Sequence, residues 1–447
     1  MGRGHDGGAP VRIPLRGNVA ASGAVRALID SAPLQRLRGV RQLGLAHLVY
    51  PGATHTRFEH SLGVYAMGGR ILDELGDREG RHPLSDEDVR CFLASCLLHD
   101  VGHYPFSHTL EDVPPDPTGR LRVVRHDERA RAIILGDPGL GAVLRDQWGC
   151  DPERICHVID ERAASGGPAD ARLRHMLAGP LNPDRLDYLE RDSLHVGVPY
   201  GRHIDLERLL AAMAFTPDGA SLCVTRKGVS AVETLIFASY LMYREVYWHH
   251  TVRAGQAMIR RAAVEALLAG EVDQDALMAA DDEQAMALLR ACRNPATREL
   301  TAGLGPGRGL YRRVWSGGVG DATALPVGAG RDLLLRLGEG GALSAEDLLA
   351  GVATALSGAL RAPVLPHQLL YDVAGRGKDL FFDVPVLGSA ISSTADPAVS
   401  LVAPTLAINF ERHAKRLQLL APAALARDVA HFLGLPPGAE ETLSPTM

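Results

Sequence analysis

The spacing of apolar positions predicts that most of the chain is helical. Between residues 25 and 264, apolar side chains recur mainly at the spacing of a helix that buries one face. The clearest amphipathic segments are 86–100, 126–135, 182–193 and 230–268. Asn182 and Pro183 form a typical helix start, because asparagine caps free backbone N–H groups and proline fits the first helical position. We therefore expect a mainly α-helical fold.

The pattern changes on either side of this helical region. Residues 1–24 are rich in glycine, and we expect one short strand there, at 11–15. After the helical region, amphipathic helix continues from 265 to 300, and the many glycines of 303–341 indicate loops.

Strands become frequent only towards the C-terminus. We expect them at 369–373, 379–387 and 405–410. A final helix is expected at 423–433, before a polar tail. The chain should therefore divide into an N-terminal segment, a helical catalytic domain and a smaller mixed α/β lobe, at 1–24, 25–265 and 266–447.

Composition narrows the class of protein. The 447 residues contain no apolar run long enough to cross a bilayer, and the N-terminus lacks an apolar signal core. We therefore expect a cytoplasmic protein that is not associated with a membrane. The six cysteines show no CxxC spacing, which argues against a disulfide framework and a thiolate zinc site. The net charge of −6 gives no general attraction for nucleic acid.

Histidines concentrate in the first third of the chain, most densely in LLHDVGHYPFSH, residues 97–108. His99 and Asp100 end an apolar helix, where an ionisable pair is costly unless something neutralises it. A divalent cation would do so. The alternative is a histidine-rich surface turn, which we disfavour because Gly102 and Pro105 shape the turn to hold the imidazoles close together.

A second polar group follows in NPDRLDYLERDS, residues 182–193. On a helix, Asp184, Tyr188 and Asp192 share one face, while Leu186 and Leu189 point elsewhere and can pack on the core. Read alone, this face would be a solvated charged surface. Read alone, His60 would more often have a structural role, and His126 is as well explained as a helix cap or surface residue.

Two imidazoles and two carboxylates suit one divalent metal ion such as Fe, Mn, Zn, Co or Mg. Four protein ligands would leave coordination positions for water and a phosphate oxygen. Such an ion lowers the pKa of bound water and polarises a P–O bond, which favours phosphate ester hydrolysis.

The order of these motifs resembles the HD superfamily, whose signature is a distant histidine, a His-Asp pair and a later aspartate. Three long stretches, 28–68, 97–111 and 184–192, resemble the dNTP triphosphohydrolases in particular, and the likeness covers roughly 12–255. The resemblance implies an HD-type helical core and metal ligation by His60, His99, Asp100 and Asp184. Asp184 is preferred over the nearby Asp187 because it matches the first aspartate of the DxxDY motif.

The resemblance also implies a proton-transfer group. His103 would act as the acid that protonates the leaving 5′-oxygen or assists attack at the α-phosphorus, supported by His126 and Glu111. The family usually has aspartate where Glu111 stands. His108 would contact the α-phosphate.

Further positions match residues that bind substrate in the family. Arg57 and Arg185 would bind phosphates. Relatives have lysine where Arg185 stands, so the compact ammonium charge is replaced here by a planar guanidinium that can donate two parallel hydrogen bonds. Tyr188 would pack beneath the sugar. The 3′-hydroxyl would be recognised by Asp192 with Gln42. Tyr247 would lie against the 2′ carbon and exclude ribonucleotides.

Two departures from the family bear on regulation and substrate. Asp30, Gln35 and Arg38 match a nucleotide effector site, but the N-terminal segment that completes that site differs here. These residues are equally explained as a packing segment. Ser239 stands where relatives carry an arginine that helps to hold phosphate.

We therefore expect metal-dependent hydrolysis of dNTPs at the α-phosphorus, releasing a deoxynucleoside and triphosphate, by a homo-oligomer such as a dimer or tetramer. Two alternatives stay open. One is a phosphomonoesterase acting on deoxynucleotides or a specialised nucleotide. The other is a catalytically silent nucleotide sensor or single-strand nucleic-acid binder, against which the complete metal and proton-transfer sets argue.

Overall fold

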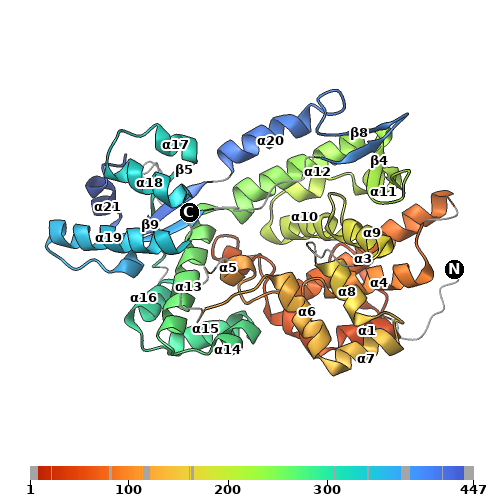
Figure 1. Cartoon of the computed structure of the whole chain (residues 1–447), viewed down its shortest axis with the longest axis horizontal. Helices are drawn as coiled ribbons and strands as arrows, with labels where there is room; N and C mark the ends of the chain where they lie inside the picture. The colour runs from red at the N-terminus through yellow and green to blue at the C-terminus, as the bar shows by residue number, and fades with distance from the viewer. Residues whose placement is uncertain are drawn as a thin grey trace. The chain divides into compact units, whose positions relative to one another are not determined.

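The computed structural model of the chain is mainly helical, as expected (Figure 1). It describes residues 9–21, 23–79, 83–111, 113, 121–160, 162, 166–305, 309–339, 342–373, 383–414 and 416–436. These pack as two compact units. The first comprises Met1–Ser107, Val124–Met242 and Leu380–Ala407, and the second comprises His108–Val123, Tyr243–Asp379 and Ile408–Met447. None of the described helices is both long and apolar enough to cross a membrane.

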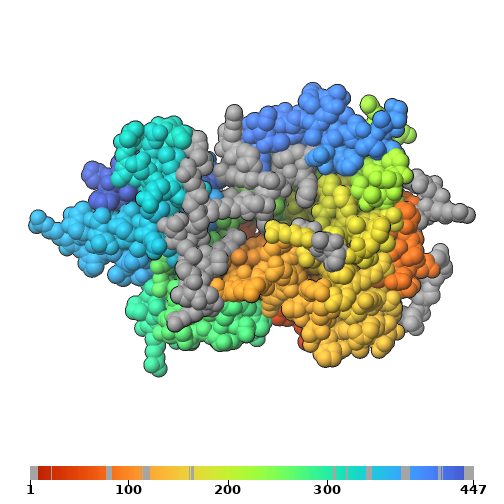
Figure 2. Space-filling view, viewed as in Figure 1, coloured from red at the N-terminus to blue at the C-terminus, as the bar shows by residue number. Residues whose placement is uncertain are grey.

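The first unit is a cluster of helices with two small sheets. Its helices are α1 (Gly23–Ile29), α2 (Ala32–Arg36), α3 (Arg57–Glu79), α4 (Asp86–Leu98), α6 (His126–Gly136), α7 (Pro138–Asp146), α8 (Pro152–Ile159), α9 (Pro168–Ala178), α10 (Pro183–Val196), α11 (Leu206–Ala212) and α12 (Val229–Met242). The long helix α3 packs against both α4 and α10. On the face shown in Figure 2, orange to yellow segments that include α6, α7 and α8 form part of the outer surface of this unit.

The sheets of the first unit are short. Strands β1 (Val11–Ile13) and β2 (Gly17–Val19) form an antiparallel pair. A second sheet has the order β3-β4-β7-β8, in which β4 and β7 are parallel, and its strands are Met213–Phe215, Leu222–Thr225, Pro385–Leu387 and Ile391–Ser393.

Local sequence explains why α4 and α10 begin where they do. The Ser85 hydroxyl accepts a hydrogen bond from the Asp88 N–H, and the Asp88 carboxylate accepts one from the Ser85 N–H, which forms a capping box for α4. The Asn182 side chain caps α10 at the Arg185 N–H, as the sequence predicts. Gly197 ends α10 at φ +82°, a left-handed conformation that glycine adopts without strain.

The second unit joins a three-stranded antiparallel sheet to helices. The sheet order is β5-β9-β6, and its strands are Arg312–Gly317, Leu417–Ala421 and Leu370–Val373. The helices are α5 (His108–Glu111), α13 (His250–Leu268), α14 (Gln274–Ala279), α15 (Asp282–Ala291), α16 (Pro295–Gly303), α17 (Val319–Thr323), α18 (Ala329–Glu339), α19 (Ala342–Leu360) and α21 (Ala426–Phe432). Residues of β5, β9, α17, α18, α19 and α21 share one hydrophobic core.

Three expectations about local structure are wrong. The segment 405–410 is not a strand but lies within α20 (Val402–His413), where Ala403 and Phe410 are buried and Ile408 is exposed. This arrangement buries one helical face, whereas alternation would have buried one strand face. The expected single helix over 230–268 is interrupted by a π-helical turn at Tyr243–Tyr247. The glycine-rich segment 303–341 contains β5, α17 and α18.

Other expected elements have shifted ends. The strand at 11–15 stops at Ile13, because Leu15 adopts a positive φ of +67° in the turn that follows. Of the strand expected at 379–387, only 385–387 forms β7, and 379–382 lies outside the described residues. The strand at 370–373 and the final helix are confirmed, while β9 was not anticipated.

Candidate active site

The residues expected to hold a metal come from the ends of three packed helices. They are His60 in the first turn of α3, His99 and Asp100 directly after α4, and Asp184 in the first turn of α10. Because α3 packs on α4 and on α10, their ends meet, although His60 and Asp184 are 124 positions apart.

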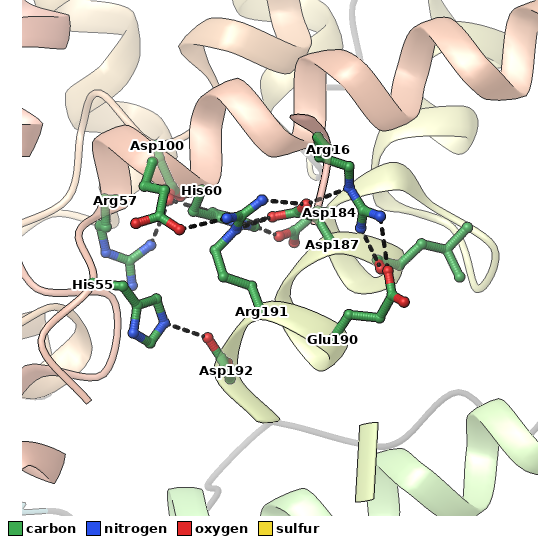
Figure 3. A network of polar contacts seen from close by, with 12 residues as sticks. Arg16, His55, Arg57, His60, Asp100, Asp184, Asp187, Glu190, Arg191 and Asp192 are labelled. Carbon is green, nitrogen blue, oxygen red and sulfur yellow. Dashed lines mark hydrogen bonds and ion pairs between the residues drawn. The ribbon is translucent and has the colours of Figure 1, made fainter. Parts of the chain in front are cut away.

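The polar atoms of these side chains lie close enough to share one ion. His60 Nε2 lies 2.9 Å from Asp184 Oδ1 (Figure 3), and His99 Nε2 lies 3.9 Å from the same oxygen. Asp100 places Oδ1 3.4 Å from His99 Nε2 and Oδ2 4.0 Å from His60 Nε2. Ligand atoms bound to one ion at about 2.0–2.2 Å are separated by roughly 3–4 Å. His60, His99 and Asp184 could therefore hold a divalent metal ion, with Asp100 beside them.

The protonation of His99 fits such an ion. Its Nδ1 lies 2.9 Å from the Cys96 carbonyl oxygen, which can only accept, so Nδ1 carries the proton. The other nitrogen, Nε2, faces Asp100 Oδ1 at 3.4 Å and Asp184 Oδ1 at 3.9 Å. This atom is buried and has no hydrogen-bond partner among the described residues. A buried ring nitrogen that has a fixed orientation but no hydrogen-bond partner is typical of a metal-binding histidine.

His60 carries charge in the absence of an ion. Burial disfavours its protonation, but the hydrogen bonds to Asp184 and Asp187 outweigh burial and raise the pKa of His60 to about 10. The proton on Nε2 thus compensates the surrounding carboxylates. A bound cation would displace that proton and take over the compensation.

The sequence favours Asp184 over Asp187 as a metal ligand, and in the structure Asp187 lies behind His60, a candidate ligand. Its Oδ2 lies 3.0 Å from His60 Nδ1 and accepts from Arg191 Nε at 2.7 Å, while Oδ1 accepts from Arg191 Nη2 and from Arg16 Nε (Figure 3). Burial opposes ionisation, yet the hydrogen bond from His60 and the charge of Arg191 hold the pKa of Asp187 well below its ordinary value. A carboxylate behind a ligating histidine fixes the ring and raises its basicity.

The sequence contains only a weak signal for this support of His60. Asp187 and Arg191 are four positions apart and so share a helix face, a spacing that is equally common on solvated helices. Gly63 also reflects this support, but the reason is evident only from the structure. A Cβ at this position of α3 would lie 2.3 Å from Asp187 Oδ1 and 2.3 Å from Arg191 Nη2. Only glycine lets α3 approach the ion pair this closely.

Arg57, expected to bind phosphate, already has two partners in the protein. Nη1 donates to Asp100 Oδ2 at 2.7 Å and Nε donates to the Ser107 hydroxyl at 2.9 Å. Despite the burial of Asp100, the Arg57 charge holds the pKa of that carboxyl well below its usual range. Arg57 thus orients a metal-site carboxylate, and its contact with phosphate stays a prediction.

The two imidazoles expected to transfer protons lie together. The rings of His103 and His126 stack with centroids 4.2 Å apart, and His103 Nε2 lies 3.1 Å from Asp100 Oδ1. Burial, followed by the charge of Arg57, lowers the pKa of His103 well below its ordinary value. Gly102 makes the stack possible, because a Cβ there would lie 1.8 Å from the His126 carbonyl oxygen.

The residues expected to contact the sugar and the phosphates in the first unit are mostly buried. Asp192 Oδ1 lies 2.8 Å from His55 Nε2, and the Gln42 N–H donates to the His55 carbonyl at 3.0 Å. Arg185 is buried, and its Nη1 donates to the Pro180 carbonyl at 3.3 Å. Tyr188 is half-buried on α10.

The remaining expected site residues belong to the second unit. Within it, His108 Nδ1 lies 2.9 Å from Glu111 Oε2, so these two side chains pair with each other. Tyr247 ends the π-helical turn and meets the Tyr243 ring edge-on, with centroids 5.1 Å apart. Such turns occur often at functional sites. The substrate roles of these residues stay predictions.

Comparison with known sequences decides the family. The HD domain model matches residues 57–189, which include every residue of the candidate metal site, and the HD associated region model matches residues 204–331. The chain is a member of the HD superfamily.

Relatives of this HD protein support the same assignment. The uncharacterized protein YwfO of Bacillus subtilis is 36% identical over 52% of this chain and 50% of its own length. Deoxynucleoside triphosphate triphosphohydrolase SAMHD1 of Bos taurus is 28% identical over 57% of this chain and 47% of its own length. The chain spans about half the length of the curated relatives it matches.

A solved structure shares the fold over nearly the whole HD protein. A phosphohydrolase from Bacteroides thetaiotaomicron superposes with a TM-score of 0.69 at 22% identity, covering 92% of this chain and 99% of that one. The likeness extends beyond the HD domain and the HD associated region, so the C-terminal part of this HD protein shares that fold too.

The segment that matches an effector site in the family is bonded internally here. Gln35 Nε2 donates to the Ile29 carbonyl at 2.7 Å, and Arg38 Nε donates to Gln35 Oε1 at 2.7 Å. The Arg38 guanidinium also lies over the Phe58 ring at 3.7 Å, whereas Asp30 is exposed. These internal contacts are compatible with the alternative in which the residues only pack within the protein, and effector binding stays a prediction.

Proposed function

We propose that this HD protein is a metal-dependent phosphohydrolase that converts a dNTP and water to a deoxynucleoside and inorganic triphosphate. The observation that carries the proposal is that His99 Nε2, buried and without a hydrogen-bond partner among the described residues, faces two carboxylates beside His60. The names of SAMHD1 and of the Bacteroides phosphohydrolase point to the same class of reaction.

His60, His99, Asp100 and Asp184 would hold one divalent ion, whose identity the donor set leaves open among Fe, Mn, Zn, Co and Mg. Bound there, the ion would acidify a water molecule and stabilise charge on a phosphate oxygen. The buried Asp187 would keep the His60 ring oriented, and Arg57 would keep Asp100 in place.

His103 would supply the proton that the leaving 5′-oxygen needs, once the negative charge of a bound triphosphate offsets the burial that lowers the pKa of this imidazole. Its Nε2 faces Asp100, and its ring is held by the His126 stack, so the imidazole is fixed beside the metal site. His126 would tune the acidity of the His103 imidazole. In the second unit, the pair His108 and Glu111 would contribute to phosphate contact and to the proton relay.

The test is incubation of the purified protein with each divalent metal and the four dNTPs or their monophosphates, followed by chromatography of the products. Deoxynucleoside and triphosphate in equal amounts would support the proposal. Orthophosphate would instead identify a phosphomonoesterase, a reading favoured by Ser239, whose buried hydroxyl donates to the Leu235 carbonyl and offers no charge for a triphosphate.

A His103→Ala variant separates the roles within the site. We expect it to lose turnover and to keep its metal content, because His103 is not among the proposed ligands. Loss of the metal as well would mean that His103 is a ligand. Wild-type protein that binds metal yet yields no product would favour a nucleotide sensor. Light scattering would test the expected dimer or tetramer, and cell fractionation the expected cytoplasmic location.

A further inference from the structure

His55 has no role in the site described so far, although its surroundings are unusual. It lies in the loop just before α3, and its side chain is fully buried. Nε2 lies 2.8 Å from Asp192 Oδ1, and the carboxylate can only accept, so Nε2 donates. The other ring nitrogen, Nδ1, is buried and has no hydrogen-bond partner among the described residues.

Both residues expected to recognise the sugar 3′-hydroxyl form hydrogen bonds with His55. Asp192 is bound by its side chain, and Gln42 is bound through the main chain, because its N–H donates to the His55 carbonyl at 3.0 Å. The Gln42 Oε1 atom is also buried and has no hydrogen-bond partner among the described residues. His55 Nδ1 and Gln42 Oε1 are therefore two buried polar atoms that a bound ligand would have to satisfy.

The His55 ring is held from its other face. It stacks on the His195 ring with centroids 4.3 Å apart and an interplanar angle of 13°. His195 Nε2 in turn lies 3.1 Å from Glu59 Oε1, which accepts from Arg191 Nη1 at 2.5 Å. Arg191 also binds Asp187 behind the proposed ligand His60 (Figure 3), so the supports of His60 and of Asp192 are connected through the half-buried Glu59 and His195.

We propose that the His55 side chain is a positioning group that fixes the orientation of Asp192, beside the main-chain bond to Gln42, and thereby makes the protein select nucleotides with a 3′-hydroxyl. The inference rests on the proposed nucleotide function and deepens it. A buried carboxylate held in one orientation binds a ligand that offers it a hydroxyl more tightly than a ligand that lacks this hydroxyl.

The test compares a dNTP with its 2′,3′-dideoxy analogue in two assays. Hydrolysis gives kcat and KM for each nucleotide, and equilibrium binding is measured in the His103→Ala background, where turnover does not interfere. The main variant is His55→Phe, which keeps the ring against His195 and removes the donor to Asp192. The rescue variant is His55→Gln, whose amide can donate to the same oxygen.

For His55→Phe we expect the preference for the 3′-hydroxyl, as a ratio of kcat/KM and as a ratio of Kd, to fall at least tenfold. For His55→Gln we expect most of the preference to return. His195→Phe is the matched control, because it changes the other ring of the stack and leaves the Asp192 contact in place, so the ratio should stay within about twofold of the wild type.

The outcomes separate the inference from the proposed function. A variant that is folded but keeps the full preference in both assays overturns the positioning role, as does a wild type that binds both nucleotides equally. Absence of hydrolysis in the wild type counts against the proposed function only, since the binding ratio still tests His55. If His55→Phe does not fold, two other variants replace it: Asp192→Asn alone, and Asp192→Asn combined with His55→Gln. If the losses of 3′-hydroxyl preference in the single variants simply add up in the double variant, His55 does not act through Asp192.

Discussion

His60 and Asp187 form a buried pair in which the imidazole Nδ1 lies 3.0 Å from the carboxylate Oδ2. The pair fixes which nitrogen of His60 is free to face Asp184. It also joins the metal site to the ion pair with Arg191, so that α3 and α10 are tied together at the point where both contribute a proposed ligand. Metal affinity should therefore depend on a residue that never touches the metal.

We expect Asp187→Asn to weaken metal binding by about 10–100-fold. An amide can accept from His60 only by turning its NH2 group towards the positively charged Arg191, so the ring loses its fixed orientation. Metal titration in competition with a chelator gives the affinity. Glu190→Gln is the control, because Glu190 pairs with Arg16 at 2.8 Å in the same network and the structure shows no contact with His60. Equal affinities for the two variants would contradict the orienting role.

The close approach of α3 to this network gives a second prediction. In Gly63→Ala, the new Cβ would lie 2.3 Å from Asp187 Oδ1 and displace it, so we expect lower stability and weaker metal binding together. Gly69→Ala lies on the same helix with nothing within 4 Å of its Cβ. That change should stabilise the protein by about 0.4–1 kcal/mol, because it restricts the unfolded chain. Thermal unfolding and metal titration of both variants provide the check. Similar behaviour of the two would show that the space around Gly63 is not limiting.

The sequence predicted the proposed ligands better than it predicted their supports. The ligand positions follow motifs, and the start of α10 at Asn182 follows a local capping rule, so both can be read from neighbouring residues. Asp187 and His55 act through partners more than 100 positions away, which no local pattern reveals. The segment 405–410 was misread for a related reason. Its β-branched residues favour a strand, but burial of Phe410 on a helical face decides the structure.

The capping box of α4 predicts a pH dependence of stability. Burial alone would raise the pKa of Asp88, but hydrogen bonds from the Ser85 N–H and the Arg154 guanidinium outweigh burial and lower it. A depressed pKa in the folded state stabilises the protein above the ordinary carboxyl pKa of about 3.9, and this contribution is lost as the pH falls through the folded value. Asp88→Asn should therefore cost about 1.5–3 kcal/mol at pH 7 and progressively less below about pH 4.

Urea unfolding of the wild type and Asp88→Asn between pH 7 and 3.5 measures this difference. Asp86→Asn is the matched control, since Asp86 lies in the same first turn and is exposed. It should cost about 0.5 kcal/mol or less. A constant gap between the wild type and Asp88→Asn across the pH range would show that the carboxylate charge does not stabilise α4.

Metal binding should itself stabilise the fold, because the proposed ligands converge only when α3, α4 and α10 are packed. An ion that binds the folded state alone adds about 2.7 kcal/mol at 100 times its Kd, so Tm should rise with metal concentration and fall again when a chelator is added. His99→Ala removes the open Nε2 and should abolish the rise. His47→Ala is the control, because His47 bonds to the Gly44 carbonyl and the structure shows no contact between it and the proposed ligands. If His99→Ala gained as much in Tm as the His47 variant, the ion would be bound elsewhere, and the proposed centre would be wrong.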